Sequence, residues 1–206
     1  NASRFVLMNL EVNENKLPDV DKMNLEDQWI VSKYNTLVKE VTENLDRFEL
    51  GIAVQKLYDF IWDEFCDWYI ELVKPRLYDK ESESRLEAQY VLTYVLSNTL
   101  KLLHPFMPFI TEEIWQHLPH EGQSIMISEW PVYQEQYHLP EQEKHMQVIM
   151  NAIKSIRNMR AEMNVAPSRK AKLYIVADSK NIFEQGTVFF EKLAGASEII
   201  VSTEKQ

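Results

Sequence analysis

The chain has 206 residues, of which 45% are hydrophobic and 11% aromatic, so it can bury one large core or two small ones. It contains no apolar run close to the roughly 20 residues that cross a bilayer and no signal-peptide pattern at its start, and we expect a soluble, cytoplasmic protein without a membrane partner. The net charge of −10 argues at first against a nucleic-acid partner, because binding to phosphates requires a cationic surface.

The first part of the chain has a pattern of apolar residues that is typical of helices. Its first residues form an apolar, helix-like pattern with no start signal before it, which suggests a fragment excised from a longer protein. Farther on, apolar residues recur at spacings of three and four, and this spacing predicts an amphipathic helix. The predicted apolar stripe comprises Ile30, Tyr34, Leu37, Val41, Leu45 and Phe48.

A second helix is predicted from Val54 to Leu72, and we expect Pro75 to end it. An aromatic run in this segment could stack RNA bases, but its helical spacing favours packing in the core. The run comprises Phe60, Trp62, Phe65, Trp68 and Tyr69. The single cysteine, Cys66, excludes an internal disulfide, and among these aromatic residues we expect it to be a small buried side chain rather than a nucleophile.

Four acidic residues of the same segment could supply paired carboxylates for acid–base chemistry. On an amphipathic helix, such residues more often face water or form salt bridges, and we expect Lys74 and Arg76 as their partners. The four residues are Asp63, Glu64, Asp67 and Glu71.

Two further helices are predicted before residue 120. The segment Leu86–Leu103 leaves little polar face, which predicts a helix at the centre of a bundle, ended by His104 and Pro105. Pro108 fits the first turn of the next helix, because proline suits a helix N-terminus.

Beyond Pro119, strands alternate with helices. The predicted elements are a short β-like run at Ile125–Ser128, a helix over 146–163, a strand over 172–177, a helix at Thr187–Leu193 and a strand at Glu198–Ser202. This alternation indicates a small α/β unit. The expected fold is therefore mainly α, with a helical bundle over residues 1–119 and a small α/β subdomain over residues 120–206.

No convincing active site is visible in the sequence. The four glycines are too few and too scattered for a phosphate-binding loop. His117 and His120 could bring two ring nitrogens together, but no further Cys, His or Asp completes a tetrahedral set. We therefore predict no catalytic residue, no metal and no cofactor in this chain.

One segment, Met150–Lys172, carries six basic residues and one acidic residue, a local charge of +5 in a chain whose net charge is −10. Arg157 and Arg160 lie one turn apart on the predicted helix, and Arg169 and Lys170 follow in a loop. Such a segment could dock on RNA, or it could be a solvated helix face followed by a basic loop. The charge pattern leaves both interpretations open.

Several motifs resemble a known family. Leu103–Trp115 and the segment Phe65–Glu71, with Lys74 after it, resemble the class I aminoacyl-tRNA synthetases for valine, isoleucine and leucine. Asn1–Val6 and Ile156–Lys170 are similar to the valyl-tRNA synthetases in particular. The resemblance extends over most of the chain and implies the anticodon-binding helical bundle of a class I aminoacyl-tRNA synthetase.

This resemblance implies that the chain binds valine tRNA at its anticodon stem-loop. The catalytic core before it and a C-terminal coiled-coil arm after it would be partners within one polypeptide, and we expect a monomer. The parent would attach valine to its tRNA with ATP and magnesium, but the His-Ile-Gly-His and Lys-Met-Ser-Lys-Ser signatures do not occur here. The chain alone should therefore bind tRNA and catalyse nothing. The alternatives are a helical interaction module that docks on the catalytic core, or the equivalent domain of an isoleucyl- or leucyl-tRNA synthetase.

Bases splayed from an anticodon loop are read on their exposed edges by polar or aromatic side chains. The RNA-binding candidates are therefore Arg4, Phe5 and Asn9 for base contacts, and Arg157, Arg160, Arg169 and Lys170 for backbone contacts. In the alternative interpretation, Phe5 belongs to the core, Arg4 pairs with an acidic neighbour, and Arg157 and Arg160 clamp the α/β subdomain to the bundle.

Overall fold

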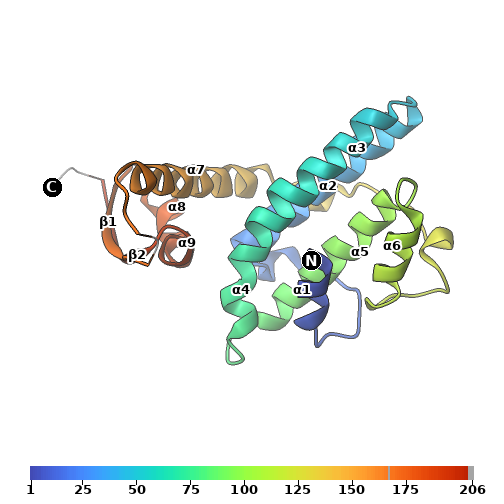
Figure 1. Cartoon of the computed structure of the whole chain (residues 1–206), viewed down its shortest axis with the longest axis horizontal. Coiled ribbons are helices and arrows are strands. Elements are labelled where there is room, and N and C mark those ends of the chain that lie inside the picture. The colour runs from blue at the N-terminus through green and yellow to red at the C-terminus, as the bar shows by residue number, and fades with distance from the viewer. Residues whose placement is uncertain (167, 204–206) are drawn as a thin grey trace. The chain divides into compact units, whose positions relative to one another are not determined.

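The computed structural model describes residues 1–166 and 168–203. The chain forms two compact units, residues 1–140 and residues 141–206 (Figure 1). Residues 120–140 pack within the first unit, where Trp130 Nε1 donates to Thr42 Oγ1 and the Leu139 N–H donates to Ser32 Oγ, both at 2.9 Å. The division at 119/120 between an RNA-binding bundle and an α/β subdomain stays a prediction.

The first unit is helical, as the periodicity predicted. Its α-helices are α1 (Ala2–Met8), α2 (Leu25–Asp46), α3 (Leu50–Asp59), α4 (Ile70–Tyr78), α5 (Arg85–Leu103) and α6 (Pro108–Trp115). Short 3₁₀ turns lie at Val20–Lys22, Ile125–Ile127 and Glu135–Tyr137. α2 and α3 lie side by side, and α5 packs against α2, α4 and α6 (Figure 1).

α5 is the central helix of this unit, which confirms the prediction. Its apolar residues Val91, Leu92 and Val95 are fully buried, and so are its polar residues Gln89 and Ser97. A helix buried on polar and apolar positions alike must be surrounded by other elements. The predicted end at His104 and the predicted start of α6 at Pro108 are also confirmed.

α3, a π-helical segment at Phe60–Tyr69 and α4 follow one another without a break. Pro75 lies inside α4, so the prediction that it ends the helix was wrong. The ring removes only one backbone donor, and the chain leaves the helical conformation at Asp79, where ψ is 104°.

The aromatic run is mostly core, as predicted, except at Trp62. Phe65 and Tyr69 are buried, but Trp62 is 53% exposed and its ring lies 6.1 Å from that of the exposed Tyr58. Val54, Tyr58 and Trp62 recur every four residues on the solvent side of the helix. Periodicity alone does not distinguish such an exposed apolar stripe from a buried one, which is why the core prediction was wrong there.

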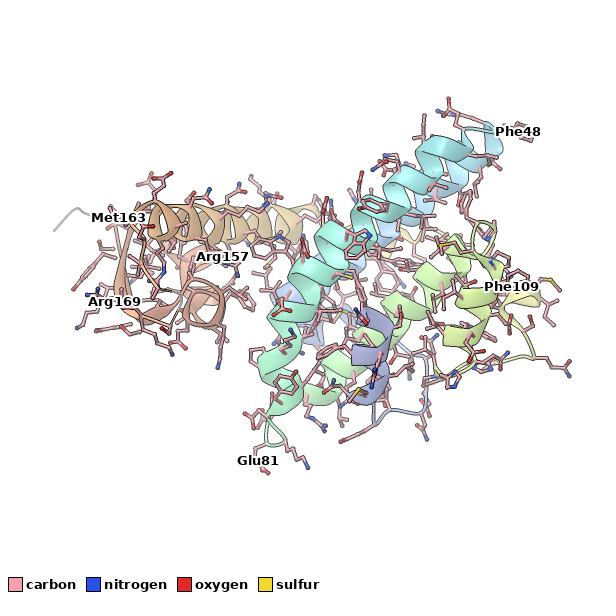
Figure 2. All side chains as sticks on the ribbon, in the orientation of Figure 1. Phe48, Glu81, Phe109, Arg157, Met163 and Arg169 are labelled. Atoms are coloured by element: carbon pink, nitrogen blue, oxygen red, sulfur yellow. The ribbon has the colours of Figure 1, made fainter. Side chains whose placement is uncertain are left out.

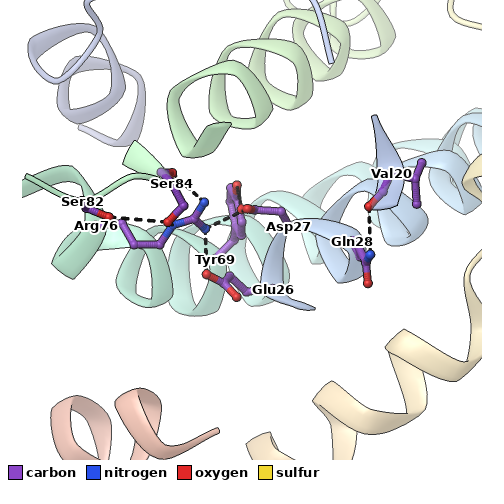
Figure 3. Close-up of polar contacts among 8 residues, drawn as sticks. All are labelled: Val20, Glu26, Asp27, Gln28, Tyr69, Arg76, Ser82 and Ser84. Atoms are coloured by element: carbon purple, nitrogen blue, oxygen red, sulfur yellow. Dashed lines mark hydrogen bonds and ion pairs between the residues drawn. The ribbon is translucent and has the colours of Figure 1, made fainter. Parts of the chain in front are cut away.

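A buried ion network joins α4 to the start of α2 (Figure 3). Arg76 Nη1 lies 2.7 Å from Glu26 Oε1 and 2.7 Å from Asp27 Oδ2, and Tyr69 Oη donates to Asp27 Oδ1 at 2.7 Å. Arg76 also donates to the side chain and carbonyl oxygens of Ser84, at 2.9 and 2.8 Å. Every member of this network except Ser84 comes from α2 or the Leu50–Tyr78 helix, so the network fixes α4 against α2.

One guanidinium in this network faces two carboxylates in a buried site. Burial and, after it, the neighbouring Asp27 charge together raise the pKa of Glu26 to about 7, against the opposing effect of Arg76. The predicted pairing of Arg76 with the acidic residues of its own helix was therefore wrong. Of those residues, Glu64 pairs with Lys33 at 2.9 Å, and Glu71 pairs with Lys74 as predicted.

The apolar stripe of α2 ends before Phe48, which sequence periodicity had placed in the core. Phe48 follows the helix with φ 60° and is 87% exposed, at the free end of the α2–α3 pair (Figure 2). The Glu49 N–H bonds to the carbonyl of Asn44 at 2.8 Å, and the Phe48 N–H bonds to that of Leu45 at 3.0 Å. This is the left-handed helix end that glycine normally occupies, and it directs the Phe48 ring away from the core.

The β-like run at Ile125–Ser128 is a 3₁₀ turn at Ile125–Ile127, so that prediction was also wrong. Ser124 Oγ accepts from the Met126 N–H at 3.2 Å, and no described strand lies beside the run to pair with it. Only Ile125 of the run is buried.

The second unit is α/β, as predicted. α7 (Pro140–Glu162) leads into β1 (Ala171–Val176), α8 (Lys180–Gln185), α9 (Thr187–Leu193) and β2 (Ala196–Ser202). β1 and β2 pair in parallel, with Lys172 opposite Glu198. α8 and α9 form the crossover that a parallel pair requires; α9 was predicted and α8 was not.

The core of this unit lies between α7 and the crossover. Ile149 and Ile153 of α7 and Phe190 of α9 are fully buried. Gly186 lies between α8 and α9, where a Cβ would come within 3.1 Å of Ile149. Glycine fits this close approach to α7, because a Cβ there would require the Ile149 side chain to shift by a few tenths of an ångström.

α7 ends at Glu162, earlier than the predicted residue 163. Asn164 has φ 52°, and the Val165 N–H bonds to the Arg160 carbonyl at 2.9 Å. Asparagine tolerates this left-handed conformation. Pro167 lies outside the described residues.

Candidate nucleic-acid interface

Three candidate residues lie on α1, a short helix anchored by the fully buried Val6. Arg4 is exposed, Phe5 is half-buried, and Asn9 is the C-cap. The Asn9 amide donates its Nδ2–H to the Phe5 carbonyl at 2.8 Å. The amide nitrogen of Asn9 is therefore used by α1 itself, whereas Arg4 forms no ion pair with any described residue.

Lys74 of α4 brings a second cation to this place. Its Nζ lies 5.5 Å from the centroid of the Phe5 ring, within range of a cation–π interaction, and it also pairs with Glu71. Because the Arg76 network fixes α4, Lys74 and the Phe5 ring are held at one position. We call Arg4, Phe5, Asn9 and Lys74 the α1 face.

The α1 face is partly aromatic and cationic, with one acidic neighbour. The alternative that Arg4 pairs with an acidic residue is not seen among the described residues, and Phe5 is half-buried rather than a core residue. A half-exposed ring with a guanidinium beside it in sequence and an ammonium over its face can stack a base and attract a phosphate.

The other four candidates lie in the second unit, Arg157 and Arg160 on the last part of α7, and Arg169 and Lys170 in the loop before β1. Figure 2 labels Arg157 and Arg169. Arg157 Nε donates to the Leu193 carbonyl at 2.6 Å, and Arg160 Nη2 donates to the carbonyls of Ala166 and Arg169. These bonds tie α7 to α9 and to the loop before β1. The two arginines thus hold parts of the second unit together. The clamp between bundle and subdomain that the sequence suggested stays a prediction.

A hollow of about 560 Å³ lies at this end of α7. Its charged lining residues are all basic: Arg157, Arg160 and Lys192. Arg169 and Lys170 are exposed in the loop that leads to β1. We call this group the α7 end; it can attract anions, although the two α7 arginines already donate to backbone carbonyls.

The comparisons with known proteins agree with these features. The family model described as "Anticodon-binding domain of tRNA ligase" matches residues 27–175, most of the chain. This chain belongs to that family. The valine–tRNA ligase of Clostridium acetobutylicum is 54% identical over 202 residues, 97% of this chain and 23% of the relative. That of Clostridium tetani is 51% identical over 97% of this chain, and that of Bacillus anthracis 42% over 100%. The chain spans about a quarter of the length of these relatives.

The anticodon-binding domain shows no assembled catalytic or metal centre in its described part. His117 and His120 both use Nδ1 on backbone carbonyls, of Glu113 and Leu118, and the described residues contain no group of three or more metal-binding side chains. Burial raises the pKa of the half-buried Cys66 thiol, which leaves it a poor nucleophile at neutral pH. None of the described helices is long and apolar enough to span a membrane.

The sequence did not predict the contact between Lys74 and the Phe5 ring. The residue was visible in the motif after Phe65–Glu71, but its contact with Phe5 joins positions far apart in the chain. A single sequence has no signal for such a pair.

Proposed function

We propose that the first unit binds the anticodon stem-loop of a valine tRNA and that the α1 face contacts its unpaired bases. The observation that carries this proposal is the geometry of that face. An exposed guanidinium without an ion-pair partner among the described residues lies next in sequence to a half-exposed ring, and an ammonium lies over that ring. Arg4 would bond to a base edge or phosphate, Phe5 would stack, and Asn9 would accept through Oδ1.

The valine specificity and the ligase context come from the relatives. The sequences reported above are named valine–tRNA ligases, which favours a valine parent over an isoleucyl or leucyl one. In that parent, the chain would recognise tRNA in the cytoplasm while another part attaches valine with ATP and magnesium. At the α7 end, Arg169 and Lys170 would contact the RNA backbone, together with Arg157 and Arg160.

Fluorescence anisotropy with labelled RNA hairpins tests this function. The probe is a stem-loop that carries a valine anticodon, and the matched control keeps the stem and replaces only the anticodon bases. We expect tighter binding to the valine hairpin and an affinity that falls as salt rises. Equal affinity for both hairpins would reject base recognition by this chain.

A second function has its own observation. An apolar hollow of about 200 Å³ lies where α1 meets α5 and α6, and its lining includes Ala2, Phe65, Leu100 and Ile110. Phe109, two residues into α6, is 90% exposed (Figure 2). Exposed apolar surface of this kind marks protein contacts, and the catalytic core of the same polypeptide is the partner that we propose for it.

A pull-down with a separately produced catalytic part of the ligase tests the docking function. We expect binding that Ile110→Asp abolishes and that Ile127→Asp leaves unchanged, because Ile127 is also an exposed isoleucine of the first unit but lies outside the hollow. Loss of binding in both variants, or in neither, would exclude this hollow as the docking site.

A further inference from the structure

A row of exposed apolar side chains lies along the outer side of α3 and the first turn of the π-helical segment after it. Leu50, Val54, Tyr58 and Trp62 recur every four residues and are exposed by 53%, 39%, 57% and 53%. The rings of Tyr58 and Trp62 lie 6.1 Å apart. We call these four residues the α3 ridge. None of them lines the apolar hollow beside α1, so the ridge is a separate surface.

The α3 ridge has the form of a surface on which another helix packs. Single exposed apolar side chains are ordinary on a protein surface, but a contiguous row of them marks an interaction site. The row extends over roughly 18 Å, at about 1.5 Å per residue. Apolar residues that recur once per turn and have charged residues beside them are the pattern by which one helix packs along another. The ridge therefore fits a helical partner.

A row of aspartates runs beside the ridge. Asp59 and Asp63 each directly follow an aromatic residue of the ridge, and Asp67 lies four residues further on; all three are exposed. Asp59 accepts a hydrogen bond from Gln55 Nε2 at 2.6 Å. No lysine or arginine of the described chain forms an ion pair with any of the three. We call them the aspartate row.

The cations nearest in sequence to the aspartate row are used elsewhere. Lys56 of α3 pairs with Glu40 of α2, Nζ to Oε2, at 2.9 Å. Glu64, by contrast, has a cation of its own, because Lys33 of α2 lies 2.9 Å from it. The fold thus neutralises the carboxylate that faces α2 and leaves the aspartate row with its negative charge, directly beside an apolar row.

This charge selects the partner of the ridge. The ring pair alone could stack RNA bases, but the aspartate row repels phosphates and the anionic surface of a membrane. A second copy of the chain, docked ridge on ridge, would bring no cation to either aspartate row. The complement is a helix with an apolar stripe and a row of lysine or arginine residues beside it.

The length of the relatives indicates the source of such a helix. This chain matches 23% of the Clostridium acetobutylicum ligase, so about three quarters of that protein lies outside the match. A helix on the same polypeptide is present at a high effective concentration, and it would cover an apolar ridge that is otherwise a liability for aggregation.

We propose that the α3 ridge docks a basic amphipathic helix from the part of the ligase outside residues 1–206. The apolar stripe of this helix packs on Tyr58 and Trp62, and its lysine or arginine side chains pair with the aspartate row. The proposal rests on the ligase context of the proposed function and is independent of RNA binding at the α1 face.

Site-specific photocross-linking in the full-length ligase tests the proposal. Tyr58 is replaced by the photoreactive p-benzoylphenylalanine, the ligase is irradiated with and without valine tRNA, and cross-linked peptides are identified by mass spectrometry. In the control, the same replacement is made at Tyr174, an exposed tyrosine of β1. We expect position 58 to cross-link, within one molecule, to a helix outside residues 1–206 that carries lysine or arginine residues three or four apart. The control position should not cross-link to that helix.

Hydrogen exchange in the full-length ligase measures the contribution of the aspartate row. Asp59→Asn and Asp63→Asn together should speed exchange in the cross-linked helix by roughly two- to fivefold, because two exposed ion pairs are lost. Glu83→Gln is the matched control, since it removes an exposed carboxylate from the loop between α4 and α5, and exchange in the helix should not change.

Each of the other outcomes overturns the proposal. A cross-link from position 58 to tRNA would assign the ridge to RNA, and one between two ligase molecules would assign it to a second copy. Cross-links confined to residues 1–206, or to a segment without lysine or arginine, would reject the basic helix. Equal exchange in the aspartate double variant and in Glu83→Gln would reject the charged contact. Loss of hairpin binding in the anisotropy assay would reject the proposed RNA binding and leave the docking intact.

Discussion

Two groups of cations in this molecule differ in what they bind. At the α1 face, Arg4 is exposed and forms no ion pair within the described part of the chain, and Lys74 lies over an aromatic ring. At the α7 end, Arg157 and Arg160 donate to backbone carbonyls of their own unit. The sequence places the larger positive charge at the α7 end, yet two of its cations serve the fold. A count of charges therefore does not identify an RNA-binding site; the partners of each cation must be known.

A third cation, Arg76, is used entirely for the fold, because it is buried against two carboxylates. Arg76→Met should lower the free energy of unfolding by about 3–5 kcal/mol, since it leaves Glu26 and Asp27 buried without a counter-charge. Chemical denaturation measures the loss. Arg85→Met removes an arginine whose partner, Glu11, is exposed, and its effect should be much smaller. Equal losses would show that the network does not fix α4.

The same network predicts an unusual dependence on pH. Burial raises the pKa of Glu26 from 4.5 to about 7, so the folded state holds a proton that the unfolded state releases. The stability that it contributes is fully present below pH 4.5 and is lost as the pH rises through about 7, a difference of roughly 3 kcal/mol. Denaturation from pH 4.5 to 8 measures it. Burial also raises the pKa of Asp27, which shares Arg76 with Glu26. Glu26→Gln should therefore reduce this slope and leave the contribution of Asp27, and an unchanged slope in the variant would contradict the assignment to Glu26.

At the α7 end, Arg160→Ala should destabilise the second unit by roughly 1–3 kcal/mol, because two backbone carbonyls lose a charged donor. Hydrogen exchange at β1 and β2 amides measures this loss locally. Arg169→Ala is the matched control, since its exposed side chain has no recorded partner among the described residues, and exchange should not change. Unchanged exchange in Arg160→Ala would mean that this cation is free for a ligand after all.

Most of the helices could be predicted, but their ends and partners could not. Periodicity located α2, α5 and α7, because core packing requires one apolar stripe on each helix. Phe48 continued that stripe in the sequence, but the left-handed helix end turned it outward. The contact of Phe5 with Lys74 depends on tertiary packing, which a spacing rule does not contain.

The smallest expected effect concerns Phe48. Replacement by glycine should raise the free energy of unfolding by about 1 kcal/mol, because glycine adopts φ 60° without the steric strain of a Cβ. Thermal denaturation measures the gain, and Phe109→Gly, which removes an equally exposed phenylalanine from a helix, should instead destabilise the unit. A loss of stability in Phe48→Gly would indicate that the ring packs in solution.

The most direct test of the proposed RNA contact compares two exposed arginines of the first unit, Arg4 on the α1 face and Arg47 at the end of α2. The affinity of Arg4→Ala and Arg47→Ala for the valine anticodon hairpin is measured over a series of salt concentrations. We predict that Arg4→Ala weakens binding and lowers the slope of log affinity against log salt by about 1, while Arg47→Ala retains both. Unchanged affinity and slope in Arg4→Ala would contradict the assignment of RNA binding to the α1 face.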